Sequence, residues 1–359
     1  MQEKIRYAYI DNMKFAACIL VALGHFFMSM TANKVMPYSF AYNYLIKTLY
    51  TFHVPIFFVC SGFLYQNSCR VTSFSAYKKE LPKKLLDLGV PYFVFSAITL
   101  LLKILFENDV TTKATAFWDT LFIHPTAPYW FLYSLFFMFL FIPCIKSKKA
   151  AYILFFVSLV FKIGVLLISD KLTVPITNGV ILFIALRLEK FCHSAIWFCF
   201  GMLLRFIDKE KIKKYGKFLA PVFLAVGIAL SFYFLSGKSD MSQGEDFITG
   251  AAFILFTVTI SIVFAPEALN RISLKFSEFF MPVFVMHTIC AAAIRISLFK
   301  IGIESLPIHI LGGLIGSFAV PIIIYIICKK LTPLMFFFYP TKTIKLLKGK
   351  KHEQGEISL

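Results

Sequence analysis

Charged residues are scarce in this sequence, at 16% of 359 residues, whereas 59% of the residues are hydrophobic. In soluble domains about a quarter of the residues are charged. The mean hydropathy of +0.77 is also far higher than that of a typical soluble domain. A long polar interval is also missing, since apolar runs recur from near residue 12 to near residue 337. This pattern excludes a separate soluble domain in that range and predicts an integral membrane protein.

Closely spaced cysteines are missing as well. The eight cysteines form no CxxC pair and no metal-ligand spacing. Most stand inside apolar runs, where a free cysteine is typical of a small core hydrophobe. We therefore expect no disulfide framework, no zinc site and no metal cofactor. The cysteines are Cys18, Cys60, Cys69, Cys144, Cys192, Cys199, Cys290 and Cys328.

Windows of about twenty apolar residues predict an all-α bundle with about ten transmembrane helices. The segment from Val174 to Leu186 is apolar but bounded by Pro175 and Arg187, so it is too short to span and is expected to be re-entrant or interfacial. The first span is nearly bilayer length and carries ionisable residues, so we expect it to be retained rather than cleaved. The expected spans are 11–30, 45–66, 86–106, 129–145, 150–169, 190–207, 217–236, 247–265, 277–298 and 308–329.

Lysine and arginine are unevenly distributed between these spans. The alternate segments that include both termini hold 25 of them, against eight in the opposite set. Because short cytoplasmic loops retain positive charge during insertion, both termini are predicted to be cytoplasmic. Anionic lipid headgroups then account for the net charge of +18, and we expect no nucleic-acid partner. Residues 1–340 form the predicted transmembrane domain, and residues 341–359 a disordered basic cytoplasmic tail.

Three ionisable residues lie in the first predicted span, where each costs roughly 2.5 to 3.5 kcal/mol to insert. Asp11, Lys14 and His25 share one face, because His25 follows Lys14 by eleven residues, close to three full turns. This face is expected to line a path, with His25 roughly 16 Å above Lys14, towards the outer leaflet. Asp11 and Lys14 form either a simple ion pair or a ligand site, whereas a buried His25 needs a polar partner or a cavity.

Other spans carry further polar side chains. His53 lies at a depth similar to that of His25, and it either packs with its polar atoms satisfied or serves catalysis. Trp130 stands where the fourth span enters from outside, as an interfacial anchor or a cavity residue. His287 and Arg295 lie eight residues apart and within about 80° on the helical wheel, so they are expected to face one cavity unless Arg295 snorkels outward.

A predicted cytoplasmic stretch at 78–84 contains four lysines, among them Lys83 and Lys84. These lysines mainly indicate how the chain is oriented in the membrane, but they could also bind the phosphates of a soluble nucleotide-carrying donor. Such a donor would also meet the Asp11 and Lys14 end of the first span.

Together these stretches resemble the membrane-bound acyltransferase-3 family, which includes O-acetyltransferases of bacterial surface polysaccharides. Lys14 and His25 reproduce the family's basic residue, ten intervening residues and histidine. Phe57-Phe58-Val59-Cys60-Ser61-Gly62 is similar to its Phe-Phe-x-x-Ser-Gly element, and Trp130-Phe131-Leu132 resembles its Trp-Phe-Leu entry to a later helix. Many members have arginine in place of Lys14, so the charge is kept while the bidentate fork is lost.

The resemblance implies transfer of an acyl group, most often acetyl from acetyl-CoA, to a hydroxyl of an extracytoplasmic or lipid-linked glycan at the plasma membrane. His25 would be a general base or a transient acyl carrier, and Lys14 with Asp11 would orient the donor. Ser61 and a gap left by Gly62 would give the pantetheine arm room between helices.

A second class of function stays open from the residues, a secondary transporter or lipid-linked sugar flippase that uses the same buried ions as a relay. Such proteins often have two related halves. The sequence contains no convincing internal repeat of the Lys14 to His25 spacing or of the Phe-Phe-x-x-Ser-Gly element. Acyl transfer is therefore the favoured hypothesis.

Overall fold

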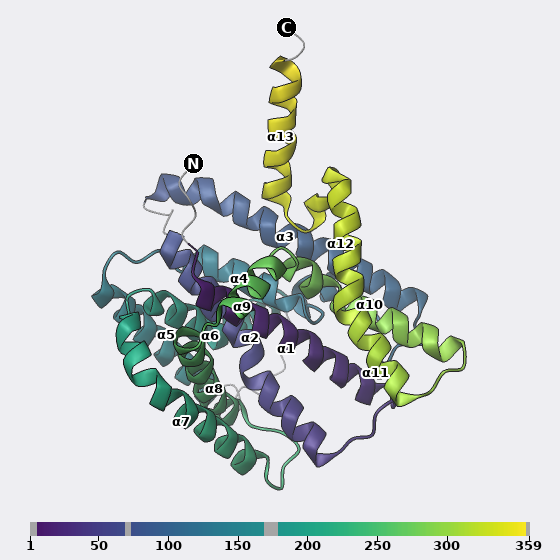
Figure 1. Cartoon of the computed structure of the whole chain (residues 1–359), viewed down its shortest axis with the longest axis horizontal. Coiled ribbons are helices and arrows are strands. Elements are labelled where there is room, and N and C mark those ends of the chain that lie inside the picture. The colour runs from purple at the N-terminus through teal and green to yellow at the C-terminus, as the bar shows by residue number, and fades with distance from the viewer. Residues whose placement is uncertain (1–5, 69–72, 169–178, 357–359) are drawn as a thin grey trace.

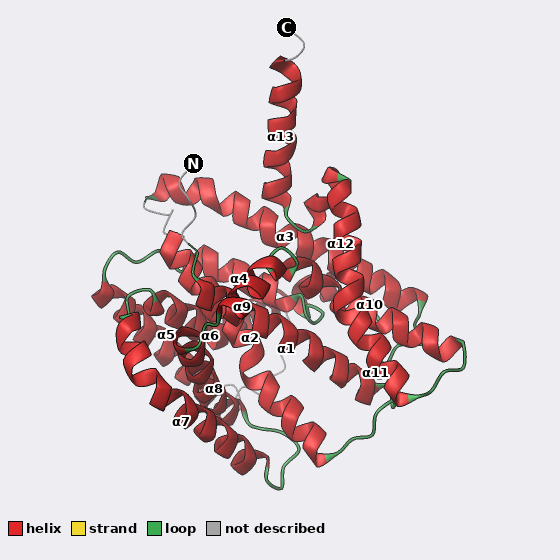
Figure 2. Ribbon diagram, in the orientation of Figure 1, coloured by secondary structure: helices red, strands yellow, loops and turns green. Residues whose placement is uncertain are grey.

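The computed structural model describes residues 6–68, 73–168 and 179–356, and in these ranges the only regular secondary structure is helical (Figure 2). The all-α prediction is confirmed. The helices are α1 (Ala8–Ala32), α2 (Phe40–Ser68), α3 (Phe74–Leu105), α4 (Trp130–Phe141), α5 (Lys148–Ile168), α6 (Gly179–Leu204), α7 (Lys209–Leu235), α8 (Gln243–Val263), α9 (Glu267–Phe276), α10 (Phe280–Lys300), α11 (Leu306–Leu314), α12 (Val320–Lys330) and α13 (Pro340–Glu356).

Eight of the described helical segments are long and apolar enough to cross a membrane, namely α1, α2, α3, α5, α7, α8, α10 and the continuous stretch Leu306–Lys330 formed by α11 and α12. Helix α4 is apolar but has only 12 residues. Helix α6 has 26 residues but contains Arg187, Glu189 and Lys190. The chain is a multi-pass membrane helix bundle, and the count of ten spans and the cytoplasmic termini stay predictions.

Two helices, α3 and α6, begin more than ten residues before the expected spans. Helix α6 starts at Gly179 and continues through Arg187, so the prediction of a separate short segment ending at Leu186 is wrong. No proline interrupts this stretch, and a single arginine does not end a helix; residues 174–178 lie outside the described ranges. Helix α3 starts at Phe74, so the lysines at 78–84 lie on a helix rather than in a loop.

The C-terminal segment also differs from its prediction. Residues 341–356 were expected to be disordered, but with Pro340 they form α13, which projects from the rest of the bundle (Figure 1). Proline suits the first position of a helix because its missing N–H has no partner there. Thr341 anchors this start to α3, since its backbone N–H and its hydroxyl both donate to Oδ1 of Asp87, at 3.0 and 2.6 Å.

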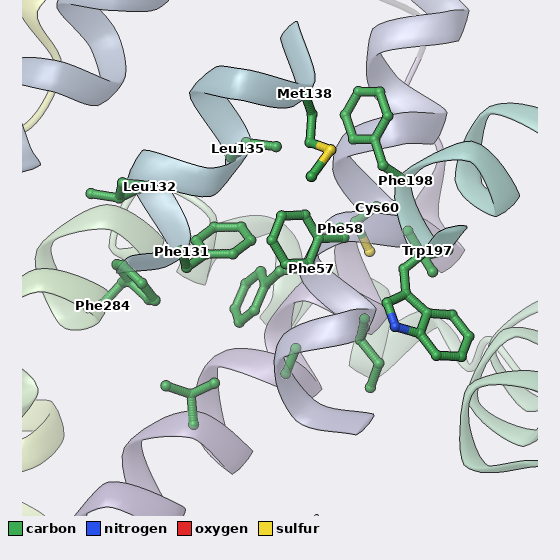
Figure 3. Close-up of a cluster of buried hydrophobic side chains, with 14 of the residues drawn as sticks. Phe57, Phe58, Cys60, Phe131, Leu132, Leu135, Met138, Trp197, Phe198 and Phe284 are labelled. Carbon is green, nitrogen blue, oxygen red and sulfur yellow. The ribbon is translucent and has the colours of Figure 1, made fainter. Parts of the chain in front are cut away.

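Aromatic side chains fill the centre of the bundle, where α2 packs between α4 and α6 (Figure 3). Phe58 of α2 contacts Phe131 of α4 with ring centroids 4.8 Å apart, and Phe57 reaches Phe284 of α10 at 6.1 Å. In lipid the hydrophobic effect does not drive helices together, so such close packing carries the association. Each aromatic pair contributes about 0.5–1.5 kcal/mol beyond its burial.

The backbones of α2 and α6 approach each other closely at Gly62 and Gly201. A Cβ atom at Gly62 would collide with the carbonyl oxygen of Phe198, and one at Gly201 would collide with that of Val59. Small residues allow helix backbones to approach in this way. The predicted gap at Gly62 is therefore wrong, because the backbone of α6 fills it.

Replacing Gly62 by alanine is expected to destabilise the fold by about 1–3 kcal/mol, because the added methyl group meets backbone that cannot move aside. Thermal unfolding of the purified protein in detergent measures this loss. Gly164→Ala is the matched control, since a Cβ there meets nothing within 4 Å and alanine favours a helix over glycine. Equal midpoints for the two variants would contradict the close approach.

Candidate functional site

A cavity of about 410 Å³ lies among α1, α2, α4, α5, α6 and α8. His25 of α1, His53 of α2 and Trp130 of α4 all line it, so three of the predicted site residues are brought together. Its other polar and aromatic lining residues are Tyr50, Thr51, Lys162, Glu189, Lys190, His193, Ser194, Trp197, Gln243, Asp246, Phe58 and Phe247.

His25 is half-buried and has a polar partner. Its Nδ1 atom lies 3.2 Å from the hydroxyl oxygen of Tyr50, within hydrogen-bond reach. Two arrangements satisfy this contact, because the phenol can donate to Nδ1 or Nδ1–H can donate to the phenol oxygen. Only the second leaves the Nε2 atom of a neutral His25 with a free lone pair, as a base or nucleophile requires.

Two further imidazoles lie close to this pair. The ring of His287 on α10 is 5.4 Å from that of His25, and the ring of His53 is 4.5 Å from that of Tyr50. His53 and His287 are each only 1% exposed. The structure therefore groups His287 with His25, although the two residues are 262 positions apart in the sequence.

The buried histidines are fixed in one tautomer by their own helices. His53 Nδ1 lies 2.7 Å from the carbonyl oxygen of Leu49, and His287 Nδ1 lies 2.9 Å from that of Phe284. Carbonyl oxygens only accept, so Nδ1 carries the proton in both rings and a neutral ring leaves Nε2 as an acceptor. Both Nε2 atoms are buried without a partner in the described part of the chain. Of these two residues only His53 lines the cavity, where a ligand hydroxyl is the kind of group that would satisfy its Nε2 atom.

Helices α1 and α10 lie side by side and run in the same direction. Near the start of both helices the Lys14 ammonium stands 5.4 Å from the ring centroid of Phe280, and further along His25 meets His287. Near their C-terminal ends Arg295 donates a hydrogen bond to the hydroxyl of Ser29.

Arg295 lies in a different cavity from His25. It lines a second space, of about 560 Å³, with Ser29, whereas the first cavity contains neither residue. The prediction that His287 and Arg295 face one cavity is wrong, because His287 lines neither space, although its neighbour Thr288 lines the second. The two side chains differ by about 80° on the helical wheel, which is enough for them to face different neighbours.

Of the two alternatives for Asp11 and Lys14, the simple ion pair between them is wrong. Asp11 Oδ2 instead lies 2.9 Å from Nε of Arg6, whose side chain folds back over the first turn of α1. Among the described residues Lys14 has no carboxylate partner, and its ammonium rests against an aromatic ring. Lys14 is therefore a half-buried cation whose charge is available to a ligand.

The predicted path along α1 is closed between Lys14 and His25. Cys18 and Val21, which lie between them on the same face, are buried in the apolar core. Any group that passes from the Lys14 level to the His25 level must therefore displace side chains or separate helices.

The lysines predicted to bind donor phosphates lie on α3, away from the residues that line the first cavity. Lys83 Nζ forms an ion pair with Glu80 Oε1 at 2.5 Å. The ammonium of Lys84 stands 4.5 Å from the ring centroid of Phe139. Ser61 is half-buried on α2, about two turns before Ser68, and does not line the first cavity.

A charged group on the cavity wall was missed by the sequence analysis. Lys162 of α5 hydrogen-bonds to Nδ1 of His193 on α6, and Nε2 of that ring is 3.8 Å from Glu189. An ammonium only donates, so His193 accepts at Nδ1 and directs its Nε2–H towards Glu189. The available signal was Lys162, a lone charge inside an otherwise apolar span, where charge is expensive.

A proline in α2 helps to bring α8 and its Asp246 to this wall. Pro55 has no N–H, so the carbonyl group of Thr51 lacks its usual partner within the helix. Gly250 of α8 packs directly against that carbonyl, because a Cβ there would collide with the oxygen. Asp246 lies one turn before Gly250 and lines the cavity.

Comparison with protein families gives a match to the model of a family described as an acyltransferase domain, over residues 7–326. This range includes all of the residues that line the His25 cavity. Curated proteins and solved structures give no match.

The cavity predicts a pattern of chemical labelling. Met28→Cys should react with a charged, membrane-impermeant maleimide on intact cells, because Met28 lines the cavity and is 38% exposed. The native Cys18, only 2% exposed, should stay unlabelled. Mass spectrometry of the digested protein reports both positions. Labelling of Cys18, or none at position 28, would contradict this placement of the cavity.

Proposed function

The chain belongs to the acyltransferase-3 family and is a membrane acyltransferase, and from this premise we propose that it transfers acetyl from cytoplasmic acetyl-CoA to a glycan hydroxyl. The acceptor is an extracytoplasmic or lipid-linked glycan at the plasma membrane. The observation that carries the proposal is the cavity lined by His25, its phenol partner Tyr50 and His53, whose Nε2 atom has no partner in the described part of the chain.

His25 acts on the acceptor hydroxyl in this proposal. Its Nδ1–H donates to the Tyr50 oxygen, and its Nε2 takes the proton as the hydroxyl oxygen attacks the thioester carbonyl. The new C–O bond replaces the C–S bond, and the imidazolium returns the proton to the leaving thiolate. Transfer through an acyl-imidazole would use the same Nε2 lone pair, so both routes require His25.

The acceptor sugar occupies the rest of the cavity. Two of the three tryptophans in the chain, Trp130 and Trp197, line it and offer aromatic faces to the C–H groups of a sugar ring. Glu189 and Asp246 can accept hydrogen bonds from sugar hydroxyls. Pockets of this kind combine apolar surface with a few convergent polar groups that fix orientation.

The donor approaches from the end of the bundle that holds Lys14. The unpaired ammonium of Lys14 suits a phosphate or the thioester end of acetyl-CoA. Lys83 and Lys84 lie on the predicted cytoplasmic face, where they would meet the nucleotide. Because Cys18 and Val21 close the direct path to His25, donor binding must shift α1 against its neighbours. No observation favours the transporter or flippase alternative over this assignment.

Release of free thiol from acetyl-CoA tests the proposal. Purified protein given extracted surface glycan should release CoA, and chemical analysis should find acetyl ester on the glycan. His25→Ala should abolish both signals while the protein still inserts and folds. Full transfer activity in the His25→Ala protein would contradict the proposal.

The Tyr50 contact gives a finer prediction. Tyr50→Phe should lower kcat roughly 10- to 100-fold with little change in KM for acetyl-CoA, because the ring of His25 loses its orienting partner. Tyr44→Phe is the matched control, since that hydroxyl donates to the carbonyl of Ile228 outside the cavity. Steady-state kinetics of both variants decide the matter, and equal kcat values would show that Tyr50 does not position His25.

A further inference from the structure

The second cavity, of about 560 Å³, lies where the C-terminal ends of α1, α3 and α10 meet residues 110–127. Its lining contains four lysine or arginine side chains and no aspartate or glutamate. Seven threonines add hydroxyl groups. The four cations are Lys103, Lys113, Arg295 and Lys300. A concave surface with one sign of charge and many hydroxyl donors suits an anion.

Arg295 gives the strongest indication of a ligand. Its side chain is buried, with the residue only 7% exposed, and it has no carboxylate partner among the described residues. Its hydrogen-bond partner is the Ser29 hydroxyl, a neutral group that takes only part of what five N–H donors offer. A buried cation without a counter-ion is costly, so a bound anion would offset a penalty that the protein alone leaves in place.

The other charges around the cavity leave a net positive field. Lys300 is neutralised by Asp109 at 3.1 Å, and His124 at the rim is bonded to Asp119 at 2.8 Å. Lys103, half-buried on α3, has no carboxylate partner in the described ranges. Together with Arg295 it supplies two uncompensated cations from different helices, and the exposed Lys113, also without a carboxylate partner in the described ranges, adds a third.

The second cavity adjoins the first. Ala127 lines both, and Ser29 follows His25 by one helical turn, a rise of about 6 Å. A molecule with one part in each cavity would place a hydroxyl near His25 and an anionic group near Arg295.

We propose that the Arg295 cavity binds a phosphate or carboxylate group of the acceptor, which makes the acceptor an anionic glycan or glycolipid. This inference rests on the proposed acyl transfer. A phosphate would come from a lipid-linked or phosphodiester-bearing glycan, and a carboxylate from an acidic sugar. Arginine recognises either group through paired N–H donors.

Calorimetric titration of the full-length protein in detergent, at constant ionic strength and without acyl-CoA, tests the site. The probes are glucose 1-phosphate, glucuronate and neutral glucose. Wild-type protein should bind one or both anionic probes at least tenfold more tightly than glucose. Binding of glucose 1-phosphate alone identifies the phosphate source, and binding of glucuronate alone identifies the acidic sugar.

Arg295→Gln should weaken anion binding at least tenfold, and Arg295→Lys should restore part of it. Arg271→Gln is the matched control, because that arginine lies on α9 with Glu267 at 3.8 Å and does not line the cavity. Lys103→Gln should weaken binding without disturbing the Ser29 contact, and it decides the outcome if Arg295→Gln protein fails to fold.

Two results would overturn the inference: equal anion binding in wild-type and Arg295→Gln or Lys103→Gln protein, or no preference of wild-type protein for either anionic probe over glucose. Because the titration contains no acyl-CoA, it is independent of the transfer assay. Thiol release without anion binding would leave acyl transfer standing with a neutral acceptor, and anion binding without thiol release would reject the transfer instead.

Discussion

The contact between the parallel helices α1 and α10 brings two pairs of polar side chains together at two heights in the bundle. His25 meets His287 with ring centroids 5.4 Å apart, and one turn further along α1 Ser29 accepts a hydrogen bond from Arg295. Inside a bilayer such groups must face one another, a cavity or a ligand, because lipid offers them no hydrogen bonds. The pairing therefore creates two polar levels, an imidazole level and a guanidinium level, in an otherwise apolar bundle.

Close packing of α6 and α8 on α2 supplies the opposite walls. Gly62 and Gly201 allow the backbones of α2 and α6 to touch, and this contact brings Glu189 and His193 into the same cavity as His53. The Phe-Phe-x-x-Ser-Gly element, which resembles the family motif, therefore has a packing role as a contact between two helices. Its glycine allows the backbone of α6 to pack directly on α2.

The sequence was sufficient for the fold class and for part of the site. His25 and His53 were predicted at similar depths and Trp130 at the outer entry of the fourth span, and all three line one cavity. Depth can be counted along each helix from its end, which is why this prediction was possible. The pairing of Asp11 with Arg6 and the separate cavity of Arg295 could not be predicted, since periodicity gives the face of a helix and not the neighbour opposite. The beginning of α6 could not be predicted from charge, because the helix continues through Arg187, Glu189 and Lys190.

In the proposed reaction the acyl group passes within the membrane from one side of the bundle to the other, past the level of Cys18 and Val21. Proteoliposomes of a single orientation, with acetyl-CoA and glycan supplied on chosen sides, test it most directly. Acetylated glycan is expected only when acetyl-CoA is on the side of Lys83 and Lys84 and the glycan is on the opposite side of the membrane. Acetylation that requires both substrates on the same side would contradict it.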